Sequence, residues 1–285
     1  MTETCFRITS QQFLDIGSLL AANVKKPFVL FECGNSVLAT PFKRTLWTIK
    51  KLIGAHCYED MIAWVSGNAG FYGVITTPHH LVKMPLGQAQ LLVGVLQNGS
   101  DDFSVYHTVN NELALVDSVA VIGADFRYQF CKQPLGLPES QERTAQAFGK
   151  KTTDTLRHLT IGIAGASGTG SVVAEQLVRL GVGRLILVDD DVVEPCNLNR
   201  ILNSTAQDAK NNVKKVSMLK HSYEMGGFRT EVIAIDTIIL NCDTIKALAQ
   251  CDIIFGCLDS VDGRVQLNRI STFYTIPYID LACRL

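Results

Sequence analysis

The sequence lacks both an excess of charge and a long apolar run. Its 26 basic and 27 acidic residues leave a formal net charge of −1, so nothing predicts a general attraction to nucleic-acid phosphates, and we expect no nucleic-acid partner. No apolar run approaches the ~18 residues of a membrane-spanning helix, and the N-terminus has no basic stretch followed by an apolar one. These absences predict a soluble, cytoplasmic protein that is not attached to a membrane.

The sequence also lacks any Cys-x-x-Cys pair among its nine cysteines. Cysteine-based zinc sites usually contain such pairs, and an odd number of scattered cysteines does not suit a disulfide framework. We therefore expect reduced thiols and find no support for zinc. His79, His80 and His107 lack metalloprotease spacing, and adjacent histidines on a strand point to opposite faces, so we interpret them as structural or solvated.

Residues 1–137 predict an α+β domain whose role the sequence does not indicate. A proline- and glycine-containing stretch, Gln133–Pro138, marks the boundary, so we expect a second domain at 138–285. Trp47 and Trp64 are interpreted as packing residues. A helix is predicted at 42–55. Segments rich in β-branched, aromatic and aliphatic residues predict strands at Phe28–Cys33, Met61–Val65, Phe71–Thr77, Leu91–Leu96, Phe103–Thr108 and Ser118–Ile122.

The second domain opens with a predicted strand, a glycine-rich turn, a helix and another strand. The apolar run Thr160–Ala164 leads into the turn Gly165–Gly170, a helix follows at 171–180, and the next strand is Arg184–Val188. Glycines let the backbone approach a phosphate closely, and the N–H groups that begin the next helix favour an anion. A tight turn without a ligand is the alternative. The candidate nucleotide-binding residues here are Gly165, Ser167, Gly168 and Gly170.

An acidic loop follows the second of these strands. A charge run is usually a solvated surface, but this one begins at the carboxyl end of a strand, where open α/β sheets bind ligands. Its first carboxylate also follows the turn at close to the ~20-residue spacing of a ribose-binding acid. The loop combines ribose acceptors, oxygens that suit magnesium and an arginine that can hold a phosphate. Its candidate residues are Asp189, Asp191, Asn197, Asn199 and Arg200.

The turn, the Asp-x-Asp loop and the segment Asn197-Leu198-Asn199-Arg200 resemble the ubiquitin-activating-enzyme-like (ThiF-like) family of adenylyltransferases. The resemblance covers about residues 139–285. It implies an α/β, Rossmann-like fold with a mainly parallel sheet and helices on both faces. It also implies that ATP and Mg²⁺ are bound, and that the C-terminal glycine carboxylate of a ubiquitin-like or sulfur-carrier protein is adenylated.

The same resemblance assigns further residues. Arg143, ahead of Gly149, matches an arginine that often reaches the triphosphate of a neighbouring subunit, which implies a homodimer. Lys214 or Lys215 matches a lysine that opens a helix; Val216 favours Lys215, although exposed solubilising lysines are the alternative. Asp259 matches an aspartate that coordinates magnesium, and the alternative is a helix N-cap formed by Asp259 or by its neighbour.

The rest of the second domain predicts helices at 139–151, 242–249 and 260–273, and strands at 229–236, 251–259 and 276–282. Family members continue with further strands and, where a thioester is made, with a catalytic cysteine. We therefore expect this chain to be truncated at its C-terminus. Cys196 and Cys283 do not stand where the nucleophile is expected, so no nucleophile is assigned.

Two other functions stay open at the level of the sequence. An NAD(P)-binding oxidoreductase is possible because Gly-Ala-Ser-Gly also occurs in dehydrogenase-like turns, but Ser167 replaces the second glycine of the dinucleotide fingerprint. A catalytically inactive scaffold would keep the fold and bind a carrier or partner without turnover.

Overall fold

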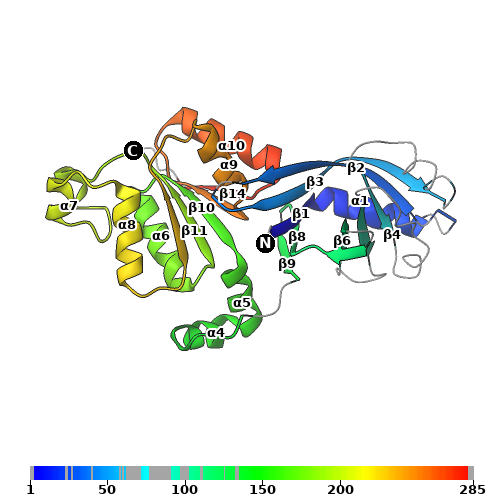
Figure 1. Ribbon diagram of the computed structural model, residues 1–285, viewed down its shortest axis with the longest axis horizontal. Coiled ribbons are helices and arrows are strands. Elements are labelled where there is room, and N and C mark those ends of the chain that lie inside the picture. Colours follow the sequence, from blue (N-terminus) through cyan, green and yellow to red (C-terminus); the bar gives the residue numbers. More distant parts are fainter. Residues whose placement is uncertain are drawn as a thin grey trace. The chain divides into compact units, whose positions relative to one another are not determined.

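The computed structural model describes residues 3–22, 25–26, 28–39, 41–57, 59, 61, 72–76, 91–96, 103–109, 112–124, 126–131 and 135–281. The chain divides into two compact units, one of Met1–Val37 with Lys43–Lys132 and one of Leu38–Phe42 with Gln133–Leu285. Figure 1 shows the ribbon of both and labels many of their helices and strands. In the described part of the chain, no helix is long and apolar enough to cross a membrane.

The first unit is built on a mixed nine-stranded sheet with the order β7-β6-β5-β4-β2-β3-β1-β8-β9. Strand β1 pairs in parallel with β3 and β8, and β4 pairs in parallel with β5. Helix α1 (Ser10–Ala22) packs on β1, β3 and β8. The strands are β1 Glu3–Thr9, β2 Phe28–Leu38, β3 Arg44–His56, β4 Tyr72–Thr76, β5 Leu91–Leu96, β6 Phe103–Val109, β7 Glu112–Leu115, β8 Ser118–Ile122 and β9 Arg127–Phe130.

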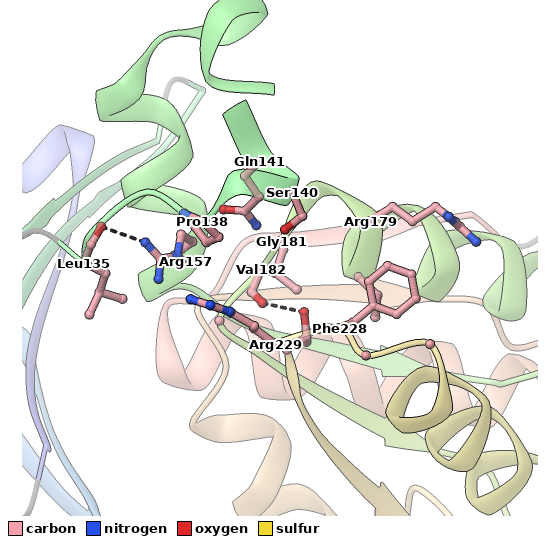
Figure 2. Close-up of a pocket in the computed structure, with 15 residues that line it drawn as sticks. Leu135, Pro138, Ser140, Gln141, Arg157, Arg179, Gly181, Val182, Phe228 and Arg229 are labelled. Carbon is pink, nitrogen blue, oxygen red and sulfur yellow. Dashed lines mark hydrogen bonds between the residues drawn. The ribbon is translucent and has the colours of Figure 1, made fainter. Parts of the chain in front are cut away.

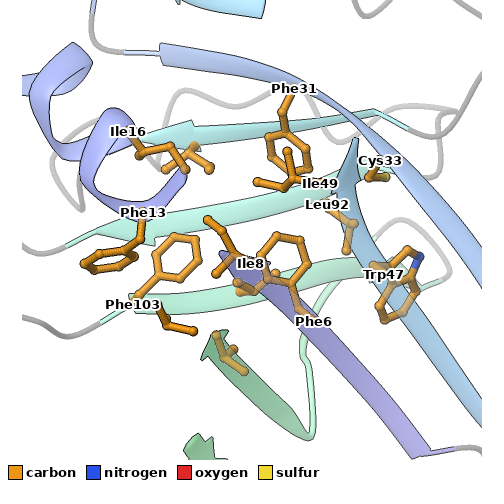
Figure 3. Close-up of a cluster of buried hydrophobic side chains, with 14 of the residues drawn as sticks. Phe6, Ile8, Phe13, Ile16, Phe31, Cys33, Trp47, Ile49, Leu92 and Phe103 are labelled. Carbon is orange, nitrogen blue, oxygen red and sulfur yellow. The ribbon is translucent and has the colours of Figure 1, made fainter. Parts of the chain in front are cut away.

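The core of this unit lies between α1 and the sheet and is rich in aromatic side chains (Figure 3). The ring of Phe103 makes edge-to-face contacts with Phe6 and Phe13, at centroid distances of 6.1 and 5.7 Å. This is a favoured arrangement for aromatic pairs. Trp47 is buried in the same cluster, as its interpretation as a packing residue predicted, whereas Trp64, His79 and His80 lie outside the described residues.

One prediction for the first unit is wrong, and a second, the strand at Met61–Val65, is tested at Met61 alone. The helix predicted at 42–55 is the long strand β3, whose β-branched residues suit a pleated sheet. Its neighbours Leu46 and Trp47 are both buried, so both faces are covered and the alternation typical of a strand is lost. Met61 belongs to no strand, because its N–H donates to the carbonyl of Cys57 at 3.1 Å, as in a helical turn. Residues 62–65 are outside the described part.

The second unit contains a five-stranded, wholly parallel sheet with the order β12-β11-β10-β13-β14. From β10 the chain adds β11 and then β12 on one side of the sheet. It then crosses to the other side of β10 and adds β13 and β14, so the strand order reverses at a switch point between β10 and β13. Crevices at such points bind ligands in open α/β sheets. The strands are β10 Thr160–Ala164, β11 Arg184–Val188, β12 Glu231–Ile235, β13 Ile253–Gly256 and β14 Tyr278–Asp280.

Helices cover both faces of this sheet, which confirms the predicted Rossmann-like fold. Figure 1 shows α6 and α8 on one face and α9 and α10 on the other. Every residue of β10 is buried, as expected for a central strand. The long helices are α6 Gly168–Leu180, α8 Lys215–Met225, α9 Cys242–Ala249 and α10 Val261–Tyr274. Shorter turns are η1 Glu139–Gln141, η2 Pro195–Asn197 and α7 Ala206–Lys210.

The helix predicted at 139–151 is interrupted. Helix α4 (Glu142–Phe148) ends at Gly149, whose φ of +90° is left-handed, and α5 (Lys150–His158) begins directly after it. Glycine adopts this conformation without a steric cost, which explains why the break falls there. The chain then enters β10.

Candidate active site

A cavity of about 1070 Å³ lies at the carboxyl ends of β10, β11, β12 and β13. It is therefore located at the edge of the sheet where the switch point between β10 and β13 opens. The cavity brings together nine of the residues predicted from the sequence, although they come from four separate segments. These residues are Gly165, Ser167, Gly168, Asp189, Asp191, Asn197, Arg200, Lys215 and Asp259.

The glycine turn forms one wall because its backbone is packed too tightly for side chains. Gly165 has a φ of +94°, and a Cβ atom there would lie 2.6 Å from the carbonyl oxygen of Cys257. A Cβ atom on Gly170 would lie 1.8 Å from the carbonyl oxygen of Gly165. Gly170 does not line the cavity, so its role in the structure is to let α6 pack against the turn.

The first turn of α6 offers backbone donors to the cavity. Ser167 is the N-cap residue, but its side chain makes no capping hydrogen bond, so no side chain occupies the N–H groups that begin the helix. Helix N-termini of this kind, next to glycines that line a cavity, favour anions. The donor set therefore fits a nucleotide phosphate.

Asp189 links the glycine turn to the acidic loop. Its carboxylate accepts hydrogen bonds from the N–H of Ala166 at 2.6 Å and from the N–H of Asp191 at 2.9 Å. Burial raises the pKa of Asp189, and these two hydrogen bonds and Lys215 partly oppose that increase. The side chain thus has a structural role as well as a position that suits a ribose.

The structure distinguishes the two candidate lysines. Lys215 is buried, and its Nζ lies 2.6 Å from Asp191 Oδ2 and 3.9 Å from Asp189 Oδ1. Lys214 does not line the cavity, and its Nζ donates to the carbonyl oxygen of Asp190 at 2.6 Å. Lys215 is therefore the lysine that faces the cavity, and carboxylates compensate its charge at the start of α8.

Lys215→Met is expected to lower the free energy of unfolding by about 1–2 kcal/mol near neutral pH, because Asp189 would lose its buried partner while the exposed Asp191 contributes little. The carboxylate of Asp189 already has a raised pKa, and the substitution raises it further. Losing Lys215 costs stability only where the Asp189 carboxyl is ionised, which is above its pKa in the folded protein. The difference in the free energy of unfolding between variant and wild type should therefore shrink as the pH falls to about 4. Urea unfolding at both pH values measures this.

Lys214→Met is the matched control, because it removes a neighbouring lysine whose side chain, in the part of the chain that the structure describes, bonds to a backbone carbonyl and not to a carboxylate. It should change stability little at either pH. An equal loss in both variants, or a Lys215→Met defect that does not depend on pH, would contradict the assigned pairing.

Hydrogen bonds within the loop fix the conformation of the Asn-Leu-Asn-Arg segment. Asn197 is buried, and its Oδ1 accepts from the N–H of Glu194 at 3.2 Å, which completes a capping box. Arg200 donates to the carbonyl oxygen of Cys196 at 2.8 Å and to Asn199 Oδ1 at 3.3 Å. Asn199 does not line the cavity. The two asparagines thus hold the loop and the arginine, and Arg200 faces the cavity.

A match to the model of the ThiF family spans residues 140–284. The chain belongs to the ThiF family.

Curated relatives of this ThiF-family chain include ubiquitin-like modifier-activating enzyme 5 of Bombyx mori, 28% identical over 123 residues, which are 40% of this chain and 31% of that protein. Another is the tRNA threonylcarbamoyladenosine dehydratase of Bacillus subtilis, 45% identical over 62 residues, which are 22% of this chain and 24% of that protein. The chain spans about a third of the length of the modifier-activating enzyme that it matches.

Solved structures similar to this chain come from Escherichia coli. The tRNA N6-threonylcarbamoyladenosine dehydratase TcdA, in complex with ATP, is 21% identical, with a TM-score of 0.45, and the match covers 51% of this chain and 61% of that one. MccB with ATP is 22% identical, also with a TM-score of 0.45, and the match covers 50% and 45%.

Asp259 lines the candidate active-site cavity from the segment that follows β13. It is exposed, and the neighbouring Ser260 is the N-cap of α10, since its Oγ accepts from the N–H of Gly263 at 3.3 Å. Asp259 is therefore not the cap. Among the described residues, the group of carboxylates that could hold a metal ion is Asp189, Asp190 and Asp191, which line the same cavity.

Arg143 is the one predicted catalytic residue that the structure does not bring to the cavity. It lies exposed on α4 and does not line the cavity of its own chain. A role in the site of a second subunit therefore stays a prediction.

Sequence reasoning missed one wall of the cavity. Residues 237–240 follow β12 and line the cavity, with Ile238 and Leu240 about half exposed. Such an apolar wall suits the flat face of a base. A signal was present in the sequence, because the aliphatic run Ile238-Ile239-Leu240 directly follows the predicted strand 229–236, at the strand end where open α/β sheets bind ligands.

Proposed function

We propose that this chain catalyses the ATP-dependent adenylation of the C-terminal glycine carboxylate of a ubiquitin-like or sulfur-carrier protein in the cytoplasm, with release of pyrophosphate. The supporting observation is the convergence of Arg200, Lys215, Asp189 and the uncapped start of α6 on one cavity. Membership in the ThiF family supports the same reaction. The cavity, at about 1070 Å³, slightly exceeds the range of about 300–1000 Å³ for small-molecule sites, so a ligand as large as ATP has room.

ATP fits the donor set of this cavity. The first turn of α6, Arg200 and Lys215 would hold the phosphates, Asp189 would accept hydrogen bonds from the ribose, and the apolar wall at 237–240 would cover the base. Asp259, with the aspartates of the acidic loop, would hold Mg²⁺, which supplies charge neutralisation on the phosphates when bound.

In the proposed reaction, a carboxylate oxygen of the carrier attacks the α-phosphorus. A new phosphorus–oxygen bond forms, the bond from the α-phosphorus to the bridging oxygen breaks, and pyrophosphate leaves with that electron pair. The attacking carboxylate is already ionised, so no general base is needed. The residues of the chain act by positioning and by compensating charge. We further propose a homodimer in which Arg143 of one subunit completes the site of the other.

Carrier-dependent exchange of pyrophosphate into ATP tests this function. We expect exchange with a small carrier protein that ends in glycine, and none with the same carrier lacking that residue. Reduction of NAD(P)⁺ without exchange would indicate the oxidoreductase, and carrier binding without exchange would indicate an inactive scaffold. Because one relative is named for a tRNA nucleoside, tRNA is a second substrate to assay. Exchange with tRNA alone would overturn the carrier assignment.

A further inference from the structure

A second cavity, of about 470 Å³, lies at the opposite edge of the parallel sheet, by the amino ends of β10, β11 and β12 (Figure 2). Its walls are the segment 135–141, the end of α5, the end of α6 with the loop after it, and the loop between α8 and β12. Strand β11 has five residues, so its length of about 16 Å separates this edge from the candidate active site. The second cavity is therefore a different site.

The second cavity is positively charged. Its lining includes Arg157, Arg179 and Arg229 and contains no aspartate or glutamate. The charge of Arg179 is already compensated, because its guanidinium group forms an ion pair with the carboxylate of Glu175 at 2.6 Å and lies over the ring of Phe228. In the part of the chain that the structure describes, neither of the other two arginines has a carboxylate within ion-pair distance. Two guanidinium charges therefore remain available to a ligand.

These two arginines are held differently. Arg157 is anchored by hydrogen bonds from its Nη1 to the carbonyl oxygens of Leu135 and Gly136, which fix the plane of its guanidinium group. Arg229 is exposed, and its side chain makes no hydrogen bond or ion pair within the described part of the chain. In Figure 2 the guanidinium groups of Arg157 and Arg229 lie on the same side of the cavity. One arginine is thus preorganised and the other is free to close on a ligand.

Gln141 gives the second cavity a buried polar group with an unmet hydrogen bond. Its side chain is 93% buried, because the exposed fraction is 7%, yet its Oε1 has no hydrogen-bond partner. The amide packs directly on Gly181, where a Cβ atom would lie 1.3 Å from Nε2. A buried polar atom without a partner is costly and rare in proteins. Figure 2 shows this amide pointing toward the hollow that the arginines line.

We propose that the second cavity binds a small phosphate monoester. Guanidinium groups bind phosphate oxygens through paired, charge-assisted hydrogen bonds, which assigns the phosphate to Arg157 and Arg229. The amide of Gln141 would bond a hydroxyl group of the organic part. The volume of the cavity lies within the ~300–1000 Å³ of small-molecule sites, so a ligand of sugar-phosphate size fits.

The helix ends at this edge do not cancel the positive charge. Helices α6 and α8 end here, and C-terminal carbonyl groups repel anions. However, the N–H of Gly181 already caps the carbonyl oxygens of Leu177 and Val178, and the N–H of Gly226 caps that of Ser222. Because these hydrogen bonds occupy carbonyl oxygens at the helix ends, fewer free carbonyl groups face the cavity. The arginine side chains extend beyond them.

Isothermal titration calorimetry of the full chain with inorganic phosphate and with ribose 5-phosphate tests the proposal. We expect ribose 5-phosphate to bind more tightly than phosphate, and ribose, which lacks the charge, not to bind. Arg229→Gln should weaken ribose 5-phosphate binding by about tenfold, because one charge-assisted contact is lost. Gln141→Glu should weaken binding by at least tenfold, because it removes the amide donor and adds a negative charge to the cavity that holds the phosphate, and its melting temperature shows whether it folds.

Two controls separate this site from the proposed active site. Arg269→Gln removes an exposed arginine of α10 that does not line the second cavity, and Arg200→Gln removes the arginine of the active-site cavity. Both should leave ribose 5-phosphate binding unchanged. No binding to the wild type, equal affinity in Arg229→Gln, or an equal loss in Arg200→Gln would overturn the proposal. Because none of these outcomes depends on pyrophosphate exchange, they leave the proposed function to its own test.

Discussion

Asp259→Ala is expected to lower carrier-dependent pyrophosphate exchange by about a thousandfold, the size of effect seen when one preorganised electrostatic contact to a transition state is removed. Asp259 is exposed and lines the cavity, and the cap of α10 is Ser260, so the substitution removes a proposed magnesium ligand and leaves the cap of α10 in place. The exchange rate is measured at saturating ATP and carrier, and the melting temperature should stay at the wild-type value.

The matched control for this experiment is Asp243→Ala. Asp243 is an exposed aspartate in the first turn of α9, paired with Lys246 at 3.2 Å, and it does not line the cavity. It should keep wild-type exchange. If Asp259→Ala retained full exchange while Asp189→Ala or Asp191→Ala lost it, the metal would belong to the acidic loop and the assignment of Asp259 would be wrong.

The second unit, which contains the candidate active site, could be predicted from the sequence because its signals are local. Strand β10 is a short apolar run that ends at glycines, and the predicted bounds of β11 and α9 match the structure. The fold of the first unit was harder to predict, because the order of its strands depends on pairings between segments that are far apart in the sequence. β3 lies beside β1, and both of its faces are covered, so neither a period of two nor a period of 3.6 is visible in it.

In the candidate site, too, local features could be predicted from the sequence and those that depend on distant segments could not. The residues of the glycine turn and the acidic loop are close in sequence, and the structure places them around one cavity. The choice between Lys214 and Lys215 could not be made from the sequence, because it depends on which side chain turns toward Asp191 at the start of α8. The cavity of Arg157, Arg229 and Gln141 gave no sequence signal, since three distant segments meet there.

Gly170→Ala is expected to have the largest effect on stability, lowering the free energy of unfolding by about 3 kcal/mol. Its Cβ atom would lie 1.8 Å from the carbonyl oxygen of Gly165, which is backbone and cannot rotate away. Either α6 moves away from the turn or the turn loses its shape. In both cases the N–H of Ala166 is displaced from the carboxylate of Asp189. The active-site cavity should therefore lose its shape while the free energy of unfolding falls. Urea unfolding and ATP titration of one preparation measure both.

Gly136→Ala is the matched control, because a Cβ atom there would meet nothing within 4 Å and the residue has no positive φ. It should be neutral or slightly stabilising, since alanine restricts the unfolded chain. A Gly170→Ala protein that unfolds like the wild type and binds ATP normally would mean that α6 can shift without disturbing the turn. The close contact of Gly170 with Gly165 would then not be what shapes the phosphate-binding wall, and Ser167 and the helix start would have to position the nucleotide by themselves.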